Sequence, residues 1–320
     1  MKEELFHNQE NQRTIKTVAI VGLGALGILY GHHLSKHMPK ENLRIIADQS
    51  RIDRYRRDKV YCNREACDFQ YVTPDQSCEP ADLVIFAVKY YGLKDAIHAV
   101  RNQVGAHTIL ISALNGISSE EMIGEAYGMD QILYCVAQGM DAVKEGNRLT
   151  YEHMGILVIG EKEAGHSSTK LESLKTFFDK AALPYEVDLD MKKRLWGKFM
   201  LNVGVNQTVA VMEGDYDIIQ KEGLPRSIMI SAMKEVISLA QAEKISLGEE
   251  DIAYWLSVLS TLNPKGKPSM RQDMEAGRYS EVELFAGTVL RLAHKHQIPA
   301  PVNQELYDKI LEMERNYGTD

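Results

Sequence analysis

Residues 17–27 read TVAIVGLGALG, a run of apolar, mostly β-branched residues followed by glycines in the spacing GxGxxG. The run predicts a buried strand, and the helical pattern after it predicts strand, tight turn and helix in succession. In such a unit Gly22 allows the turn, Gly24 lets a pyrophosphate approach the backbone, and Gly27 lets the helix pack closely. The first helix would then donate amides to phosphate. The stretch therefore predicts nucleotide binding; the alternative is a glycine-rich structural turn.

Three more strands follow, separated by helical patterns. They are LRIIAD (43–48), DLVIFAVK (82–89) and TILISALN (108–115). The last two are uniformly apolar, as parallel strands covered on both faces are. This alternation predicts a doubly wound parallel sheet. Residues 130–188 contain further strand patterns, which we expect to form an antiparallel extension, and a helical pattern at 167–181. RIDRYRRDK, directly after the second strand, is compatible with a helix or a loop.

From residue 189 onward the chain has helical periodicity and no strong strand pattern. The predicted helices are 190–212, 225–244, 249–261, 280–297 and 303–314. The fold class is therefore α/β, an N-terminal Rossmann domain with an all-helical C-terminal domain. We predict a flexible tail at 1–15, a dinucleotide-binding domain at 16–188 and a helical substrate and dimerisation domain at 189–320. The polar start is not a signal peptide.

The amino-acid composition and net charge exclude several classes of binding partner. The 320 residues are enough for two domains, and 37 basic against 45 acidic residues give a net charge of −8. This balance argues against nucleic-acid and anionic-membrane partners. No stretch approaches the roughly 20 apolar residues of a membrane span. The four cysteines form no close pair and the histidines no metal spacing, so we expect reduced thiols, no metal and a cytoplasmic protein.

Two opposing signals bear on the cofactor. Asp48 ends the second strand, 21 residues after Gly27. A carboxylate at this place usually binds the adenosine ribose 2′-hydroxyl and favours NAD over NADP. Four arginines follow within nine residues and can instead receive a 2′-phosphate or form a solvated helix face: Arg51, Arg54, Arg56 and Arg57.

Polar residues also end the third and fourth strands. Lys89 follows FAV and Asn115 follows AL. The carboxyl edge of an open α/β sheet is where ligands bind, so both are predicted to lie at the cofactor site. The alternative for each is a simple turn-forming role.

A polar stripe marks the first helix of the C-terminal domain. Lys198, Asn202 and Asn206 are spaced i, i+4, i+8 within WGKFMLNVGVNQTVAVM and share one helix face. Buried polar groups need partners, and a polar substrate would provide them. Lys198 is the candidate general acid, because a lysine beside apolar groups can give a proton to a ketone oxygen. Its alternative is a surface-reaching amphipathic lysine.

Two downstream residues complete the candidate set. Glu281, in RYSEVELF, can pair with the lysine or bind a substrate hydroxyl, and Glu283 is the near alternative. Ser269 can bind a carboxylate. It can also cap a helix, with Gln272 completing a capping box.

The whole pattern resembles the ketopantoate reductase (2-dehydropantoate 2-reductase) family over nearly the whole chain after the tail. The segments that carry the resemblance are GLGALG, AVK at 87–89, LNG at 114–116, LWGKFMLNVGVN at 195–206, SMRQDMEAGRYSEVE at 269–283 and HKHQIPAPVN at 294–303.

The resemblance implies hydride delivery from NADPH to the C2 ketone of ketopantoate, giving pantoate for pantothenate synthesis, in a cleft between the two domains. It implies that Lys198 is the catalytic lysine and that Glu281 binds substrate and supports it. Asn202, Asn206 and Ser269 would bind substrate. Asn115 would lie near the nicotinamide and Lys89 at the edge of the cofactor site. A homodimer through the helical domain is a further implication.

Three residues depart from the family pattern. Asp48 stands where an arginine often binds the NADP phosphate, so NAD(H) becomes an alternative cofactor. Gly266 stands where an asparagine is common three residues before the serine, although Asn263 can substitute. Gln207 stands where a proline is common. The alternatives are thus a paralogue that reduces another 2-keto acid, or a nucleotide sensor without catalysis.

Overall fold

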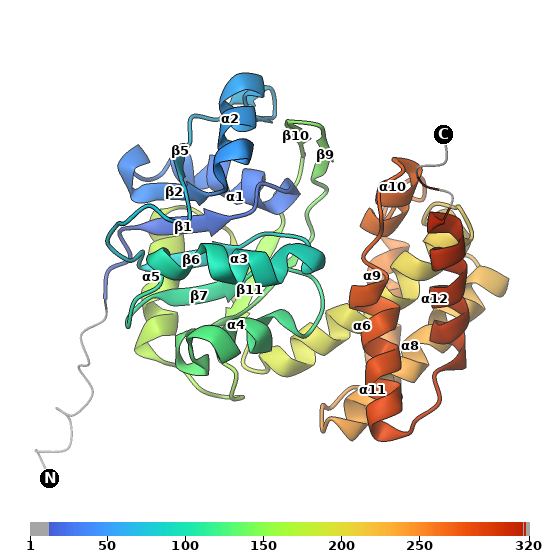
Figure 1. Ribbon diagram of the computed structural model, residues 1–320. Helices are drawn as coiled ribbons and strands as arrows, with labels where there is room; N and C mark the ends of the chain where they lie inside the picture. The colour runs from blue at the N-terminus through green and yellow to red at the C-terminus, as the bar shows by residue number, and fades with distance from the viewer. Residues whose placement is uncertain (1–12, 316, 318–320) are drawn as a thin grey trace, which may run out of the picture. The chain divides into compact units, whose positions relative to one another are not determined.

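The computed structural model describes residues 13–315 and 317, so most of the predicted tail lies outside the described residues. The chain separates into two compact units that divide between Met191 and Lys192. The first contains the strands and α1–α5, and the second contains the helices from α6 onward (Figure 1). Among the described residues no helix is both long and apolar enough to cross a bilayer.

A parallel five-stranded sheet forms the centre of the first unit. The strand order is β5-β2-β1-β6-β7, so the chain starts in the middle, runs to one edge and crosses to the other. The strands are β1 (Val18–Val21), β2 (Leu43–Ile46), β5 (Gln70–Val72), β6 (Leu83–Phe86) and β7 (Ile109–Ser112). This order confirms the predicted doubly wound Rossmann sheet.

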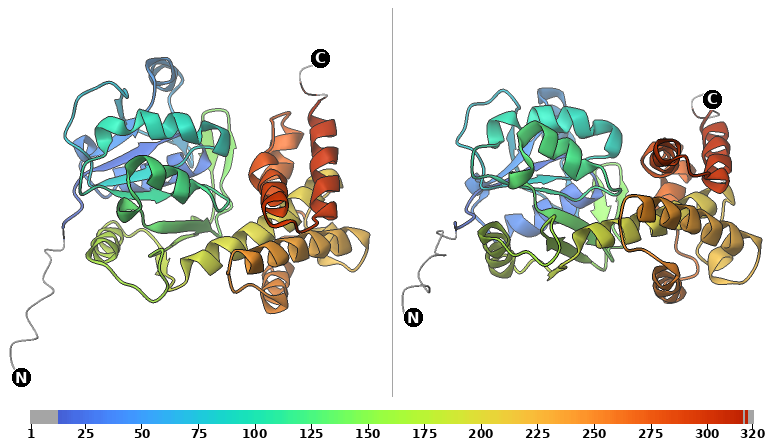
Figure 2. Two further views of the ribbon diagram at one scale, coloured as in Figure 1. Left: turned by 60° about the horizontal axis from the view of Figure 1, so that its bottom comes forward. Right: turned by 90° about the horizontal axis from the view of Figure 1, so that it is seen from below.

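Side chains alternate between two covered faces of this sheet. Ile20, Ile45 and Ile85 point to the face where α1 (Ala25–Ser35) and α5 (Thr169–Lys180) complete one apolar cluster. The intervening residues, such as Val84 and Leu110, are equally buried. They face the side on which Figures 1 and 2 show α3 (Leu93–Ala99) and α4 (Ser119–Tyr127). Burial on both faces explains the uniformly apolar strand sequences.

The predicted antiparallel extension is present. β8 (Tyr134–Gln138) pairs antiparallel with β11 (Ile156–Gly160), which pairs parallel with β12 (Tyr185–Val187). The amide of Leu133 donates to the Leu110 carbonyl at 3.0 Å, which joins this sheet to β7. A second, small sheet has the order β4-β3-β10-β9. Its strands are β3 (Tyr61–Cys62), β4 (Glu65–Ala66), β9 (Val143–Glu145) and β10 (Arg148–Thr150).

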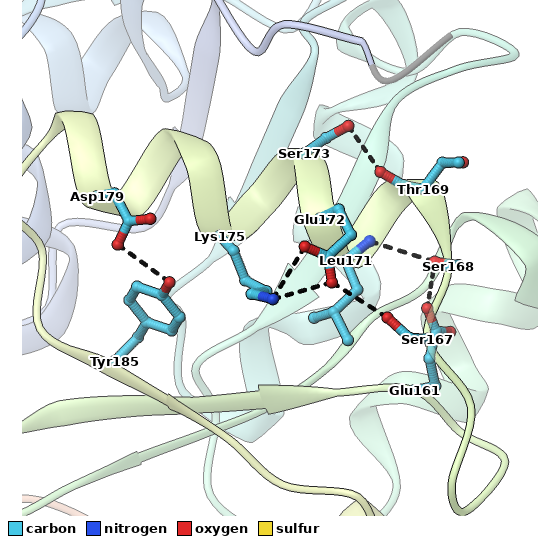
Figure 3. A network of polar contacts seen from close by, with 10 residues as sticks. All are labelled: Glu161, Ser167, Ser168, Thr169, Leu171, Glu172, Ser173, Lys175, Asp179 and Tyr185. Carbon is cyan, nitrogen blue, oxygen red and sulfur yellow. Dashed lines mark hydrogen bonds and ion pairs between the residues drawn. The ribbon is translucent and has the colours of Figure 1, made fainter. Parts of the chain in front are cut away.

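The helix predicted at 167–181 is α5, and the residue before its first turn shows why the helix begins there. The Ser168 hydroxyl accepts a hydrogen bond from the Leu171 amide at 3.2 Å and caps the helix. The same hydroxyl donates to Glu161, while Lys175 binds Glu172 one turn apart (Figure 3). Local capping chemistry of this kind is readable from sequence.

The second unit is helical, as predicted. α8 lies against α7, α9, α11 and α12. The helices are α6 (Met191–Val211), α7 (Asp217–Gln220), α8 (Leu224–Ala242), α9 (Glu249–Ser260), α10 (Ser269–Glu275), α11 (Thr288–His296) and α12 (Pro301–Glu314). A Cβ on Gly204 of α6 would lie 2.6 Å from Met233 Cγ, so this glycine allows α6 and α8 to cross closely.

One detail differs from the predictions, and one alternative that was left open is now decided. The helix predicted at 280–297 begins instead as a π-helix at Glu283–Gly287 before continuing as α11. Residues 51–58 of RIDRYRRDK, left open between helix and loop, belong to α2 (Gln49–Asp58). All four cysteines are free thiols, and burial raises the pKa of Cys62 to about 11 and of Cys67 to about 12. These two thiols are thus protonated and unreactive at neutral pH.

Gly27→Ala should destabilise the protein by about 3 kcal/mol, although alanine normally favours a helix. A Cβ at Gly27 would overlap the carbonyl oxygen of Gly22. Gly24→Ala is the matched control, because its Cβ would meet only the Ala87 carbonyl at an ordinary 3.6 Å. Urea denaturation of both variants measures the difference; equal stabilities would contradict the packing argument.

Candidate active site

The glycine-rich turn lies at the carboxyl edge of the sheet. Gly22 has a φ of +98°, and a Cβ there would approach the Ala87 carbonyl oxygen to 2.6 Å. Gly24 is the exposed N-cap of α1 and supplies no capping side chain. The first turn of α1 contains no acidic residue. An accessible helix N-terminus without a side-chain cap fits a phosphate, so the turn fits a dinucleotide cofactor.

Lys89 and Asn115 lie beyond the strands to which they were assigned. β6 ends at Phe86 and β7 at Ser112, so both residues belong to the connections that follow. Since β6 and β7 are neighbouring parallel strands, both connections emerge at the edge that holds the glycine turn. Lys89 also begins a short 3-10 turn, Tyr90–Gly92, and Gly116 follows Asn115 with a φ of +95°.

Asp48 caps α2. Its Oδ1 accepts hydrogen bonds from the Ser50 hydroxyl at 2.6 Å and from the Arg51 amide at 2.9 Å. Its Oδ2 lies 3.3 Å from Nε of Arg51. The Ser50 bond first, and then the Arg51 amide, lower the pKa of Asp48, so the carboxylate is charged at neutral pH. The side chain is still 53% exposed, and a ribose can reach it.

The other arginines of α2 have varied surroundings. Arg57 forms an ion pair with Asp58 at 2.7 Å, and Arg54 lies over the Tyr55 ring. Arg51, the nearest to the end of β2, already faces Asp48. The predicted phosphate-binding group is therefore partly neutralised by neighbouring carboxylates.

In the second unit, one amide connects two of the predicted substrate residues. The Asn206 side chain is buried, and its Nδ2 donates to Oδ1 of Asn202 at 3.2 Å. Its Oδ1 accepts from the Ser269 hydroxyl at 3.3 Å and from the Met270 amide at 3.2 Å. The structure thus brings Asn202, Asn206 and Ser269 together, although Asn206 and Ser269 are 63 residues apart in the chain.

Ser269 does not form the predicted capping box. Pro268 is the N-cap of α10, and Ser269 is already the first helical residue. Gln272 donates instead to the Lys267 carbonyl at 2.8 Å. The proline fixes the helix start one residue earlier than the Ser–Gln spacing suggested, because its ring suits the extended backbone before a helix. The serine hydroxyl is therefore directed to Asn206.

The two candidate acids differ in their surroundings. Glu283 is exposed, receives a hydrogen bond from the Tyr307 hydroxyl and lies 3.7 Å from Arg291. Glu281 is half-buried and stands just before the π-helix, where its carbonyl accepts the Leu284 amide at 3.0 Å. Such helical irregularities are frequent at functional sites. Lys198, on α6, is also half-buried.

Two of the departures from the family pattern have local explanations. A Cβ at Gly266 would lie 3.0 Å from both the Asn263 carbonyl and the Tyr216 ring, so an asparagine there would force a shift. Asn263 is exposed and its side chain accepts from the Lys265 amide, which makes it a turn former. Gln207 is fully buried and donates to Asn303 of α12 at 3.0 Å.

Sequence reasoning missed one feature in each unit. One is the Met270 amide, which shares the Asn206 carbonyl oxygen. The other is Glu120, buried behind the turn that carries Asn115. The run SSEE after LNG was the available signal for Glu120, but it looks like an ordinary helix start. Among the described residues Asp141, Glu152 and His153 come close enough to share an ion, but all three are exposed.

Comparison with known proteins agrees with this architecture. The family model described as "Ketopantoate reductase PanE/ApbA" matches residues 18–164, and its C-terminal counterpart matches 190–314. A 2-dehydropantoate 2-reductase of Halobacterium salinarum is 25% identical over 93% of this chain and 99% of its own length.

Solved structures show the same fold. A 2-dehydropantoate 2-reductase from Geobacter metallireducens superposes with a TM-score of 0.79 at 22% identity, covering 92% of this chain and 99% of its own. A D-mandelate dehydrogenase in complex with NADH gives 0.84 at 19% identity, covering 94% of this chain and all of its own.

Asn206→Ala should lower the free energy of unfolding by about 1–3 kcal/mol, because it leaves the buried Met270 amide without its acceptor. Ser269→Ala, which removes an exposed hydroxyl that only donates to Asn206, should cost less than about 1 kcal/mol. Urea titration of the two variants compares them. A larger loss for Ser269→Ala would contradict this view of the network.

Proposed function

The chain belongs to the ketopantoate reductase family, and we propose that it reduces a 2-keto acid to the 2-hydroxy acid with a reduced nicotinamide dinucleotide. The observation that carries the proposal is the polar face of α6. Lys198 shares that face with Asn202 and Asn206, and Asn206 is connected to Ser269. A cation and hydrogen-bonding groups gathered on one helix suit a ligand with a carboxylate and a ketone.

In this proposal each residue has a defined task. When bound, the cofactor supplies the hydride that adds to the ketone carbon. Lys198 gives a proton to the ketone oxygen as negative charge develops on it. Asn202, Asn206 and Ser269 orient the substrate, and Glu281 holds the lysine or a substrate hydroxyl. Gly22, Gly24 and Gly27 admit the pyrophosphate, while Lys89 and Asn115 line the nicotinamide end.

Ketopantoate is the first substrate to test, because the relatives that match most of the chain are named 2-dehydropantoate 2-reductases. Gly266 favours a second candidate, a paralogue acting on another 2-keto acid. A side chain there would meet Tyr216, so this chain lacks the amide that the family commonly has at this position. Because one structural neighbour is named D-mandelate dehydrogenase, aryl 2-keto acids are the second group of substrates to test.

We infer a preference for NADH over NADPH from Asp48. Asp48 lies two residues beyond β2 rather than ending the strand, and its ionised, half-exposed carboxylate stands where the adenosine ribose is bound in Rossmann folds. A 2′-phosphate would meet this charge, and Arg51 beside it is already paired. A non-catalytic nucleotide sensor remains the alternative class; it would bind the cofactor without turning over any 2-keto acid.

Lys198→Ala should lower kcat about a hundredfold or more, because the developing oxyanion loses its proton donor. Cofactor affinity, measured by nicotinamide fluorescence, should stay close to that of the wild type, since the glycine turn is unchanged. Lys192→Ala on the same helix is the control and should retain activity. An equal loss of kcat and cofactor affinity in Lys198→Ala would refute the assignment.

Asp48→Asn should raise the NADPH-to-NADH ratio of kcat/KM about tenfold, which corresponds to roughly 1.4 kcal/mol of removed repulsion. Asparagine still caps a helix, so α2 should be preserved. Asp58→Asn, which removes an exposed carboxylate at the other end of α2, is the control. Absorbance at the reduced nicotinamide band gives both rates; an unchanged ratio would show that Asp48 does not choose the cofactor.

A further inference from the structure

A buried carboxyl group lies behind the turn that carries Asn115. Glu120, in the first turn of α4, is only 2% exposed. Ser119 beside it and Ser112 at the end of β7 are 2% and 1% exposed. Acidic side chains are rarely buried so completely unless they are paired, so this one requires an explanation.

These three residues form a continuous chain of hydrogen bonds that ends at the turn. The Leu114 amide donates to the Ser112 hydroxyl at 3.3 Å, and that hydroxyl donates to Ser119 at 2.8 Å. Ser119 in turn donates to Oε2 of Glu120 at 2.9 Å. The amide at the start of the chain belongs to the residue directly before Asn115.

An ionised carboxylate fixes the direction of this chain, because it can only accept hydrogen bonds. Ser119 must then donate to Glu120, and Ser112 must donate to Ser119. A lone pair of Ser112 is left facing the Leu114 amide, as the structure has it. The charge also strengthens the bond it receives and polarises the hydroxyls before it. A neutral acceptor would allow the hydroxyls to reverse.

The arrangement has a cost in stability. Within the described residues, Oε1 of Glu120 and the nearby Ser118 hydroxyl are buried without a hydrogen-bond partner. Burial raises the pKa of Glu120 to about 7, the neighbouring charge of Glu121 adds to this, and the bond from Ser119 opposes it. Because the folded state holds the proton more tightly than the unfolded chain, the native state loses stability as pH rises toward 7. A glutamine would accept the same bond without that loss.

We propose that Glu120 is a positioning residue that holds the Leu114–Asn115 turn in place through Ser119 and Ser112. The turn is fixed from its other side by the Ala113 amide, which donates to the Phe86 carbonyl at 2.9 Å. Two anchors, one to β6 and one to the buried carboxylate, leave the turn little freedom. The proposal rests on the proposed function, in which Asn115 lines the nicotinamide end of the cofactor site.

Protonation of Glu120 should loosen this anchor. A carboxylic acid can donate to Ser119, and the two hydroxyls can then point toward the Leu114 amide instead of accepting from it. Two other titratable groups act with Glu120: Glu121 on the same helix raises its pKa, and the Tyr134 side chain of β8 lies within reach of its charge. Glu121 is exposed and Tyr134 is buried, so neither replaces Glu120 as the acceptor.

The test uses the full-length protein with Ser119→Ala, Glu120→Gln, the double variant, and Glu121→Gln as the control. Hydrogen exchange at the Leu114 amide reports on the turn without any need for catalysis. Fluorescence titration with NADH measures cofactor affinity, and steady-state rates between pH 5.5 and 8.5 with a 2-keto acid give kcat and KM.

Ser119→Ala should speed exchange of the Leu114 amide about tenfold, as expected when its acceptor loses support. It should lower kcat at least about tenfold, since small misplacement of an orienting group is costly. NADH affinity should change by less than about threefold, because the glycine turn is unchanged. Glu120→Gln should remove the inflection near pH 7, and the double variant should be no worse than the worse single one.

Unchanged Leu114 exchange in Ser119→Ala, additive losses in the double variant, or a persistent inflection near pH 7 in Glu120→Gln would each overturn the proposal. If the wild-type protein reduces no 2-keto acid, the proposed function fails while the exchange measurement still decides whether Glu120 anchors the turn. The two failures are therefore distinguishable. Glu121→Gln should match the wild type in Leu114 exchange and NADH affinity, and should keep the pH inflection but move it to lower pH, because the Glu121 charge raises the pKa of Glu120.

Discussion

The first unit depends on the close approach of α1 to the end of β1, which only glycine permits. A side chain at Gly27 would occupy the place of the Gly22 carbonyl, and one at Gly22 would reach the Ala87 carbonyl at the end of β6. These contacts set the angle at which α1 leaves the sheet and leave its N-terminus exposed. The cofactor edge, including the connections of Lys89 and Asn115, is built around that angle.

The second unit follows a different constraint, the pairing of most of its buried polar groups, although Oε1 of Gln207 is buried without a hydrogen-bond partner among the described residues. α6 carries two adjacent buried side-chain amides, and each finds its hydrogen-bond partners in a different place. Asn206 is bound to Asn202, Ser269 and the Met270 amide, which suits a surface prepared for a polar ligand. Gln207 points to Asn303 of α12, which also binds Glu235, and this group fixes helices to one another. Adjacent positions of one helix thus point to different partners, one toward α10 and one toward α12.

A third constraint concerns two carboxylates of the first unit, one exposed and one buried. Asp48 and Glu120 are both carboxylates close to the ends of parallel strands, yet their environments differ. Asp48 receives two hydrogen bonds and faces an arginine, so its pKa falls. Glu120 is buried, and burial raises its pKa to about 7 although the Ser119 hydroxyl donates to it. The same functional group therefore has a lowered pKa at the start of α2 and a raised pKa in the first turn of α4.

Sequence alone determined the elements whose signals are local: the strand–glycine–helix start, the apolar parallel strands, the helical second half and the stripe of Lys198, Asn202 and Asn206. Periodicity and glycine spacing carry this information because each depends on residues near one another in the chain. Tertiary structure decided that Ser269 binds Asn206 rather than capping α10, that Glu283 is occupied by Tyr307, and that Glu120 supports the Asn115 turn. Those outcomes depend on contacts between distant segments and on burial, which no local pattern encodes.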